Sequence, residues 1–196
     1  MRRLVLGTTA IAISTLLVWA TFALNADASS TSLAKQVLSL GQMGSGWFAE
    51  SNSNTGVGCL HDLLEPRGVT QTQAAEVDFV HTGDVPFLDE KIATYSSAKT
   101  AFEKIAATIA GCPNPSGPYK GFTSDGTVTK FSFPAEGNQS VAYQMVFKTG
   151  DVTFYYDYLI ARKKKVIIAV LEGSYPAVST TQFTGFVHLA LAKVTS

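Results

Sequence analysis

Residues 127–172, TVTKFSFPAEGNQSVAYQMVFKTGDVTFYYDYLIARKKKVIIAVLE, decide the fold class of this 196-residue chain. The stretch contains four segments rich in β-branched and aromatic residues, each bounded by turn residues, which is typical of β-strands. The breaks at 148–151 and 162–165 are short and polar, as hairpin turns are. The pattern therefore predicts four antiparallel strands side by side, at residues 127–133, 141–148, 152–161 and 166–172.

Two of these strands carry apolar side chains on both faces. Residues 166–171 include no polar side chain, and along 152–161 aromatic and aliphatic residues alternate toward both sides. Strands of this kind must be covered on both faces. Amphipathic helices are predicted at 98–110, after Ser96 or Ser97, and from Ser179 or Thr180 to Lys193. The sequence thus predicts an α/β fold, a helix/sheet/helix sandwich with a mostly antiparallel central sheet.

Shorter elements are expected before the four-strand run. They are a helix at 33–40, a strand at 47–50, a short helix at 59–64, strands at 72–81 and 87–95, and a loop or sheet edge at 113–126. No internal repeat or second domain boundary is visible, so residues 29–196 are expected to form one domain.

The N-terminal residues 1–28 have the features of an export signal. Arg2 and Arg3 precede an uncharged apolar run from Leu4 to Leu24, and residues 26–28, Ala-Asp-Ala, fit the small-x-small cleavage pattern. An apolar run of about 20 residues also suffices to span a bilayer. The segment is therefore predicted to be a signal peptide, with an uncleaved membrane anchor as the alternative, and either way the domain is expected to be secreted or in the cell envelope.

Charge and composition exclude one class of partner. The chain has 15 basic and 15 acidic residues, and 46% of its residues are hydrophobic against 15% charged, which indicates an ordered globular protein. Nucleic-acid binding would require a clustered basic excess. No nucleic-acid partner is expected.

Cys59 and Cys112 are the two cysteines of the chain. In an oxidising compartment two cysteines most simply form one disulfide. A metal site or a catalytic thiol is the alternative, but no histidine lies at ligand spacing from either cysteine. A bridge between these two positions would stabilise the fold by roughly 4 kcal/mol.

The histidines and the hydrolase motifs give weak signals. The nucleophile-elbow pattern G-x-S-x-G is absent. The three histidines lie on separate predicted elements, two of them near a carboxylate: His61 beside Asp62, His81 three residues before Asp84, and His188. Surface or turn-stabilising roles are favoured for them. A hydrolase with a site assembled from scattered residues such as His61, Asp62 and Asp157 is kept as an alternative.

A carboxylate stands within the aromatic strand at 152–161. Three environments can explain Asp157: it faces solvent, it pairs with a cation, or it lines a polar cleft. Tyrosine hydroxyls need hydrogen-bond partners when they are buried. A cluster of tyrosines around a carboxylate therefore suggests a wet cavity. The candidate cleft residues are Tyr143, Tyr155, Tyr156, Asp157 and Tyr158.

One basic cluster is present, formed by Arg162, Lys163, Lys164 and Lys165. The favoured interpretation is a solvated hairpin tip that also protects a sheet edge from pairing. The alternative is contact with an anionic membrane surface, where each basic residue contributes about 1 kcal/mol.

The order of several short motifs resembles a known family. The motifs are LSLGQMGSGW (38–47), GCLHDLL (58–64), DEKIATY (89–95), GC (111–112), the four-strand run, and TQF (181–183) at the start of the last helix. Together they resemble the PknH-like extracellular sensor domain family of actinobacterial cell envelopes. The likeness extends over about residues 33 to 194.

The resemblance implies a non-enzymatic α/β domain with a cleft for an unidentified small ligand, and no catalytic motif or cofactor. Cys59–Cys112 would match one of the two disulfides of the kinase-borne domain. No kinase domain or second apolar span is read in the sequence, so signalling across a membrane by this chain alone is not expected. The predicted function is an exported sensor-like or carrier domain that binds a small molecule. The alternatives are an interaction module for another envelope protein and the hydrolase.

Overall fold

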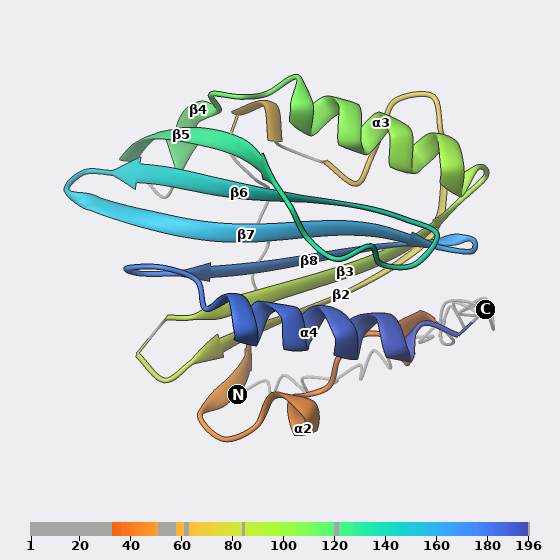
Figure 1. Cartoon of the computed structure of the whole chain (residues 1–196), viewed down its shortest axis with the longest axis horizontal. Coiled ribbons are helices and arrows are strands. Elements are labelled where there is room, and N and C mark those ends of the chain that lie inside the picture. Colours follow the sequence, from red (N-terminus) through yellow and green to blue (C-terminus); the bar gives the residue numbers. More distant parts are fainter. Residues whose placement is uncertain (1–32, 51–57, 61–62, 84, 120–121, 196) are drawn as a thin grey trace, which may run out of the picture.

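The computed structural model describes residues 33–50, 58–60, 63–83, 85–119 and 122–195 (Figure 1). The predicted signal peptide at residues 1–28 lies outside the described residues. The same holds for His61, Asp62 and Asp84.

The described residues form strands, helices and one short 3-10 turn, η1. In chain order these elements are α2 (Leu40–Met43), β1 (Trp47–Glu50), η1 (Gly58–Leu60), β2 (Gln71–His81), β3 (Phe87–Tyr95), α3 (Ala98–Ala110), β4 (Ser116–Tyr119), β5 (Phe122–Phe131), β6 (Gln139–Thr149), β7 (Val152–Lys163), β8 (Val166–Ser174) and α4 (Thr180–Lys193). None of the described helices is long and apolar enough to cross a membrane.

All strands in the described residues belong to one eight-stranded sheet in the order β1-β2-β3-β8-β7-β6-β5-β4. Every neighbouring pair is antiparallel, which confirms the predicted antiparallel meander. The pairing of β3 with β8 joins the N-terminal strands to the C-terminal meander, although the two strands are far apart in sequence.

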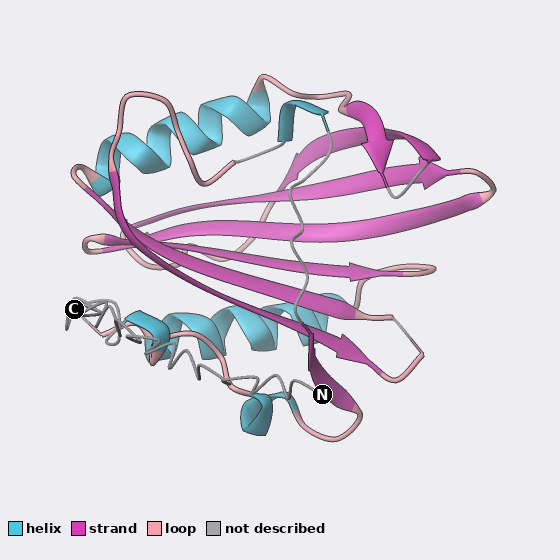
Figure 2. Cartoon of the chain, turned by 180° about the vertical axis from the view of Figure 1, so that it is seen from behind, coloured by secondary structure: helices cyan, strands magenta, loops and turns pink. Residues whose placement is uncertain are grey.

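The two long helices pack against opposite faces of this sheet (Figures 1 and 2). Because side chains alternate along a strand, β7 contributes Tyr158 and Ile160 to the core beneath α3, and Leu159 and Ala161 to the core beneath α4. We call these sides of the sheet the α3 face and the α4 face. The sheet dominates the fold, with one long helix on each face, so a balanced helix/sheet/helix sandwich is not established.

Both long helices begin at a serine cap. The Ser97 hydroxyl accepts a hydrogen bond from the Thr100 backbone N–H, and Ser179 does the same for Gln182, which satisfies backbone groups that a helix start leaves open. The apolar side of α4, the second of the predicted amphipathic helices, is buried at Phe183, Phe186, Val187, Ala190 and Leu191.

Three predicted elements differ from the structure. Of the helix predicted at 33–40, only Leu33 and Ala34 are helical before α2, because the chain turns after them and the Leu38 backbone N–H donates to the buried carboxylate of Glu90 at 2.5 Å. Helix α2 instead starts at Leu40, after the Ser39 cap. The helix predicted at 59–64 is described only as the three-residue η1. Strand β5 begins earlier and ends earlier than residues 127–133, and the expected edge at 113–126 holds β4, the last strand of the sheet.

The disulfide between Cys59 and Cys112 is present, with Cα atoms 5.9 Å apart. It links Cys59 in η1 to Cys112, two residues after the end of α3, so it holds η1 against the α3 side of the sheet. This confirms the predicted pairing.

Replacing Gly173 by Ala is expected to lower the free energy of unfolding by about 1 to 3 kcal/mol, as overpacking does. A Cβ atom at Gly173 would overlap the ring of Phe87, which lies over this glycine from the neighbouring strand. The matched control is Gly185→Ala in α4, where no atom lies within 4 Å of the added Cβ. This control should stabilise the protein by about 0.5 to 1 kcal/mol. Urea unfolding of both variants measures the difference, and equal effects would contradict this packing.

Candidate functional site

A pocket of about 410 Å³ lies on the α4 face, between β5, β6 and β7 on one side and the first turns of α4 on the other. Its volume is within the range of small-molecule sites. The lining residues are Thr129, Phe131, Ser132, Phe133, Pro134, Gln144, Asp157, Thr180 and Thr184.

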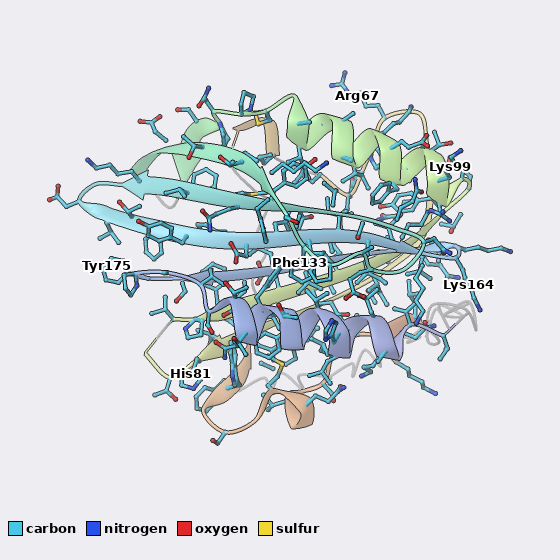
Figure 3. All side chains as sticks on the ribbon, in the orientation of Figure 1. Arg67, His81, Lys99, Phe133, Lys164 and Tyr175 are labelled. Carbon is cyan, nitrogen blue, oxygen red and sulfur yellow. A yellow bond between two sulfur atoms is a disulfide. The ribbon has the colours of Figure 1, made fainter. Side chains whose placement is uncertain are left out.

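The outer wall of the pocket is the segment that follows β5. Phe133, which Figure 3 labels above α4, contacts the ring of Phe183 edge-to-face with centroids 5.7 Å apart. Farther along the segment, the carboxylate of Glu136 lies 2.9 Å from the ring of His188 on α4. These two contacts hold the segment against α4, so the wall is tied to the helix at two points.

The floor of the pocket is a row of polar side chains across neighbouring strands. The register pairs Thr129 with Gln144, Gln144 with Asp157, and Asp157 with Glu172, so all four side chains lie on the α4 face. The Gln144 amide Nε2 donates to Asp157 Oδ1 at 3.2 Å. The next residue across the sheet, paired with Glu172, is the apolar Leu88 on β3, so the row of polar side chains ends at Glu172.

Asp157 and Glu172 form a buried carboxylate pair. Asp157 is 4% exposed and Glu172 is fully buried, and neither carboxylate oxygen of Glu172 has a hydrogen-bond partner among the described residues. Burial, together with the smaller effect of the charge of Asp157, raises the pKa of Glu172 to about 8. Burial also raises the pKa of Asp157, against the hydrogen bond from Gln144. The pair therefore resists carrying two negative charges at neutral pH.

The opposite wall comes from the start of α4. Thr180 and Thr184 are one turn apart and place their side chains on the same side of the helix, facing the pocket. The pocket thus combines a carboxylate, an amide and several hydroxyls with the rings of Phe131 and Phe133. Such a surface can hold a small molecule that has an apolar body and a polar group directed at Asp157.

The predicted cleft residues divide between the two faces of the sheet. Asp157 lines the pocket, and Tyr155 lies on the same face but is not part of the lining. Tyr143, Tyr156 and Tyr158 lie on the α3 face, within or against its hydrophobic core. One cleft cannot contain all five side chains, because adjacent residues of a strand point to opposite faces.

The three tyrosines on the α3 face have structural partners there. The Tyr143 hydroxyl donates to the backbone carbonyl of Ala106 on α3 at 3.2 Å. The ring of Tyr156 makes edge-to-face contacts with Phe87 and Phe147, each at a centroid distance of 5.6 Å. Burial raises the pKa of both the Tyr143 and the Tyr158 phenols. These side chains stabilise the core beneath α3.

Two of the three histidines, His81 and His188, lie on separate elements of the structure, and His61 lies outside the described residues. His81 contacts the indole of Trp47 edge-to-face at 5.4 Å, and His188 pairs with Glu136. His61 and Asp62 are not described, so the hydrolase hypothesis remains a prediction. Within the described ranges, no three His, Cys, Asp or Glu side chains are grouped to hold a metal ion.

The basic cluster lies at the β7–β8 hairpin and is partly engaged by the chain itself. Arg162 donates to the side chain of Gln139 and Lys163 donates to the carbonyl of Leu191, both at 2.7 Å. Lys165 is exposed at the tip, next to Lys164. Contact with a membrane surface remains a prediction.

Sequence reasoning missed most of the pocket, and a signal for its floor was present in the hairpins. The loops of the β6–β7 and β7–β8 hairpins consist of residues 150–151 and 164–165, with positive φ of 60° at Gly150 and 56° at Lys164. Two-residue hairpins of this kind fix the register of their strands. Counting back from both turns aligns Gln144, Asp157 and Glu172 in one row.

Comparison with known proteins finds a similarity of fold and none of sequence. No protein family model matches the chain, and no curated protein matches it in sequence. Among solved structures, the extracellular domain of PknH from Mycobacterium tuberculosis is similar with a TM-score of 0.61 at 10% sequence identity. The match covers 84% of this chain and 95% of that one. At this identity the likeness shows a related fold, and it does not show membership of the family that the sequence motifs resemble.

Proposed function

We propose that this chain is an exported, extracytoplasmic domain that binds a small ligand in the pocket beneath α4 and performs no chemistry on it. Its role in the cell envelope would be that of a sensor-like or carrier domain. The observation that carries the proposal is the pocket of about 410 Å³ with a 4%-exposed carboxylate, Asp157, in its lining.

Buried polar groups support this assignment. Burying a carboxylate without partners is costly, and native proteins rarely tolerate it without a functional reason. Here Asp157 has Gln144 as a partner, while its neighbour Glu172 has none among the described residues. A ligand that donates hydrogen bonds to Asp157, the carboxylate in the lining, would offset the cost of burying that group.

The fold and the disulfide support the location. The structure with a similar fold is an extracellular domain, and a disulfide such as Cys59–Cys112 persists mainly in oxidising compartments. Both are consistent with the export signal predicted at residues 1–28.

Native mass spectrometry of the full chain, exported by an oxidising host, tests the proposal. We expect an excess mass that disappears on denaturation. Thr184→Phe should abolish this mass because the ring would fill the pocket from α4. The matched control is Thr181→Phe, on the exposed side of the same helix, which should retain the mass.

Two results would contradict ligand binding in this pocket. One is an excess mass that survives in Thr184→Phe, which would place the ligand elsewhere. The other is a bare chain that instead forms a stable complex with an envelope protein, which would favour the interaction module. Conversion of the released compound by the purified chain would favour the hydrolase.

A further inference from the structure

We propose that the ligand of this pocket is a small organic cation, a protonated amine on an apolar body, bound at Asp157. The inference rests on the proposed function, since it assigns a chemical class to the ligand of the same pocket. It depends on three features of the lining: its charge, its hydrogen-bonding groups and its aromatic wall.

The charge of the pocket is negative. Asp157 is the charged member of the lining, and none of the lining residues is Lys, Arg or His. Glu172 lies next to Asp157 in the cross-strand register, fully buried and with both oxygens unpartnered among the described residues. An anionic ligand would meet the carboxylate of Asp157 with no cationic side chain in the lining to compensate it. A cationic ligand would offset the charge of Asp157 in a site of low dielectric constant, where such attraction is strong.

The hydrogen-bonding groups of the lining also favour a donor. An ionised carboxylate only accepts hydrogen bonds, a hydroxyl can accept, and an ammonium group offers three donors and no acceptor. Asp157 on the floor and Thr180 and Thr184 on the α4 wall therefore match an ammonium group between them. Gln144 donates one of its two amide hydrogens to Asp157, and its amide oxygen can accept a hydrogen bond from a ligand.

Helix N-termini carry partial positive charge, which favours anions near the start of a helix such as α4. Here the cap residue Ser179 already occupies the Gln182 backbone N–H through its hydroxyl. The lining groups from this turn are the residues Thr180 and Thr184, whose hydroxyls can accept from a cation. The carboxylate on the floor therefore determines the sign of the preferred ligand.

The aromatic wall suits the same ligand. Phe131 and Phe133 line the pocket with ring centroids 6.1 Å apart and mutually perpendicular planes, at 85°. Phenylalanine rings attract cations over their faces and also bury apolar groups. An amine on an apolar body can use both properties at once.

The test compares three probes of the same shape and different charge. Benzylamine, benzyl alcohol and benzoate are titrated into the isotope-labelled full chain at neutral pH, and the amide NMR shifts of the pocket residues report binding. We expect benzylamine to bind at least tenfold more tightly than benzyl alcohol, and benzoate to bind more weakly than both. Asp157→Asn should remove the preference for benzylamine, whereas Asp151→Asn at the exposed β6–β7 turn should keep it.

A second variant avoids altering the buried carboxylate. Thr184→Lys places an ammonium group of the chain beside the pocket, so it should abolish benzylamine binding, while Thr181→Lys on the exposed side should not. If benzyl alcohol or benzoate bound as tightly as benzylamine, the preference for a cationic ligand would be overturned, but ligand binding in the pocket would still be supported. If none of the three probes shifts a pocket residue, the assignment of an amine ligand is overturned, and the excess mass in native mass spectrometry decides separately whether the proposed function stands.

Discussion

The Glu172→Gln variant is expected to be more stable than the wild type at pH 8, with a free energy of unfolding higher by about 4 kcal/mol. Glu172 is fully buried on the α4 face without a partner among the described residues, and burial together with the charge of Asp157 raises its pKa from 4.5 to about 8. Ionising this side chain is therefore unfavourable in the folded protein and easy in the unfolded chain.

The sign follows from the number of bound protons. Between pH 4.5 and pH 8 the folded protein holds a proton on Glu172 that the unfolded chain has lost, so wild-type stability falls as pH rises through this window. Below pH 4.5 both states are protonated and the effect vanishes. Glu90 acts in the same direction, because burial raises its pKa to about 7 despite the Leu38 N–H and Lys193.

Denaturant unfolding at pH 5 and pH 8 measures the effect. The wild type should be clearly less stable at pH 8 than at pH 5, and Glu172→Gln should remove the larger part of this difference. Glu103→Gln serves as a control because this side chain is exposed on α3. If the free energies of unfolding of the wild type and of Glu172→Gln changed in parallel with pH, Glu172 would have an ordinary pKa in the folded protein.

Removing the disulfide is expected to lower the free energy of unfolding by about 4 kcal/mol. Cys59 and Cys112 are 53 residues apart in sequence, so their bond restricts a long loop of the unfolded chain. Cys112 is also 2% exposed within the core beneath α3, which adds a packing loss when it is shortened.

The measurement is denaturant unfolding of the wild type and of the double variant Cys59→Ala, Cys112→Ala, each with and without reductant. Reductant should destabilise the wild type toward the level of the double variant and should not affect the variant. Oxidised and reduced wild type unfolding at the same denaturant concentration would contradict a stabilising role for the bridge.

The elements predicted best are those whose sequence pattern is strong and local. The helix at 98–110 and the strands at 47–50 and 87–95 have the observed bounds, because a capped amphipathic period and short β-rich runs each determine their own structure. The meander strands are longer than predicted at most ends, since pairing with neighbours extends them beyond the apolar core.

The elements predicted worst depend on distant contacts. Leu33, Val37 and Leu40 have helical spacing, yet Leu38 donates to Glu90, 52 residues away, and the segment turns to meet the sheet. The pocket has the same origin. Its wall segment at 132–134 follows a strand that ends earlier than its apolar residues suggest, and the helix that it meets begins at Thr180.

The sequence singles out Asp157 because a carboxylate is unusual within an aromatic strand, whereas Glu172 lies near the end of a predicted strand, where a carboxylate is common. The tyrosines next to Asp157 in the sequence do not share its side of the sheet. Residues adjacent in a strand are on opposite sides of the sheet, so Tyr156 and Tyr158 belong to the α3 face.

The pocket residues all fall between positions 129 and 184, so one uninterrupted piece of the chain encodes the whole binding surface. The disulfide, α3 and the strands β1 to β3 come before this piece in the sequence. The lining of the proposed binding pocket therefore lies in one part of the chain, and the disulfide lies in another. If the pocket binds a ligand as proposed, substitutions before residue 129 can change the stability of the domain without replacing a lining residue. An exchange of residues 129–184 between related chains is then expected to transfer the specificity as a unit.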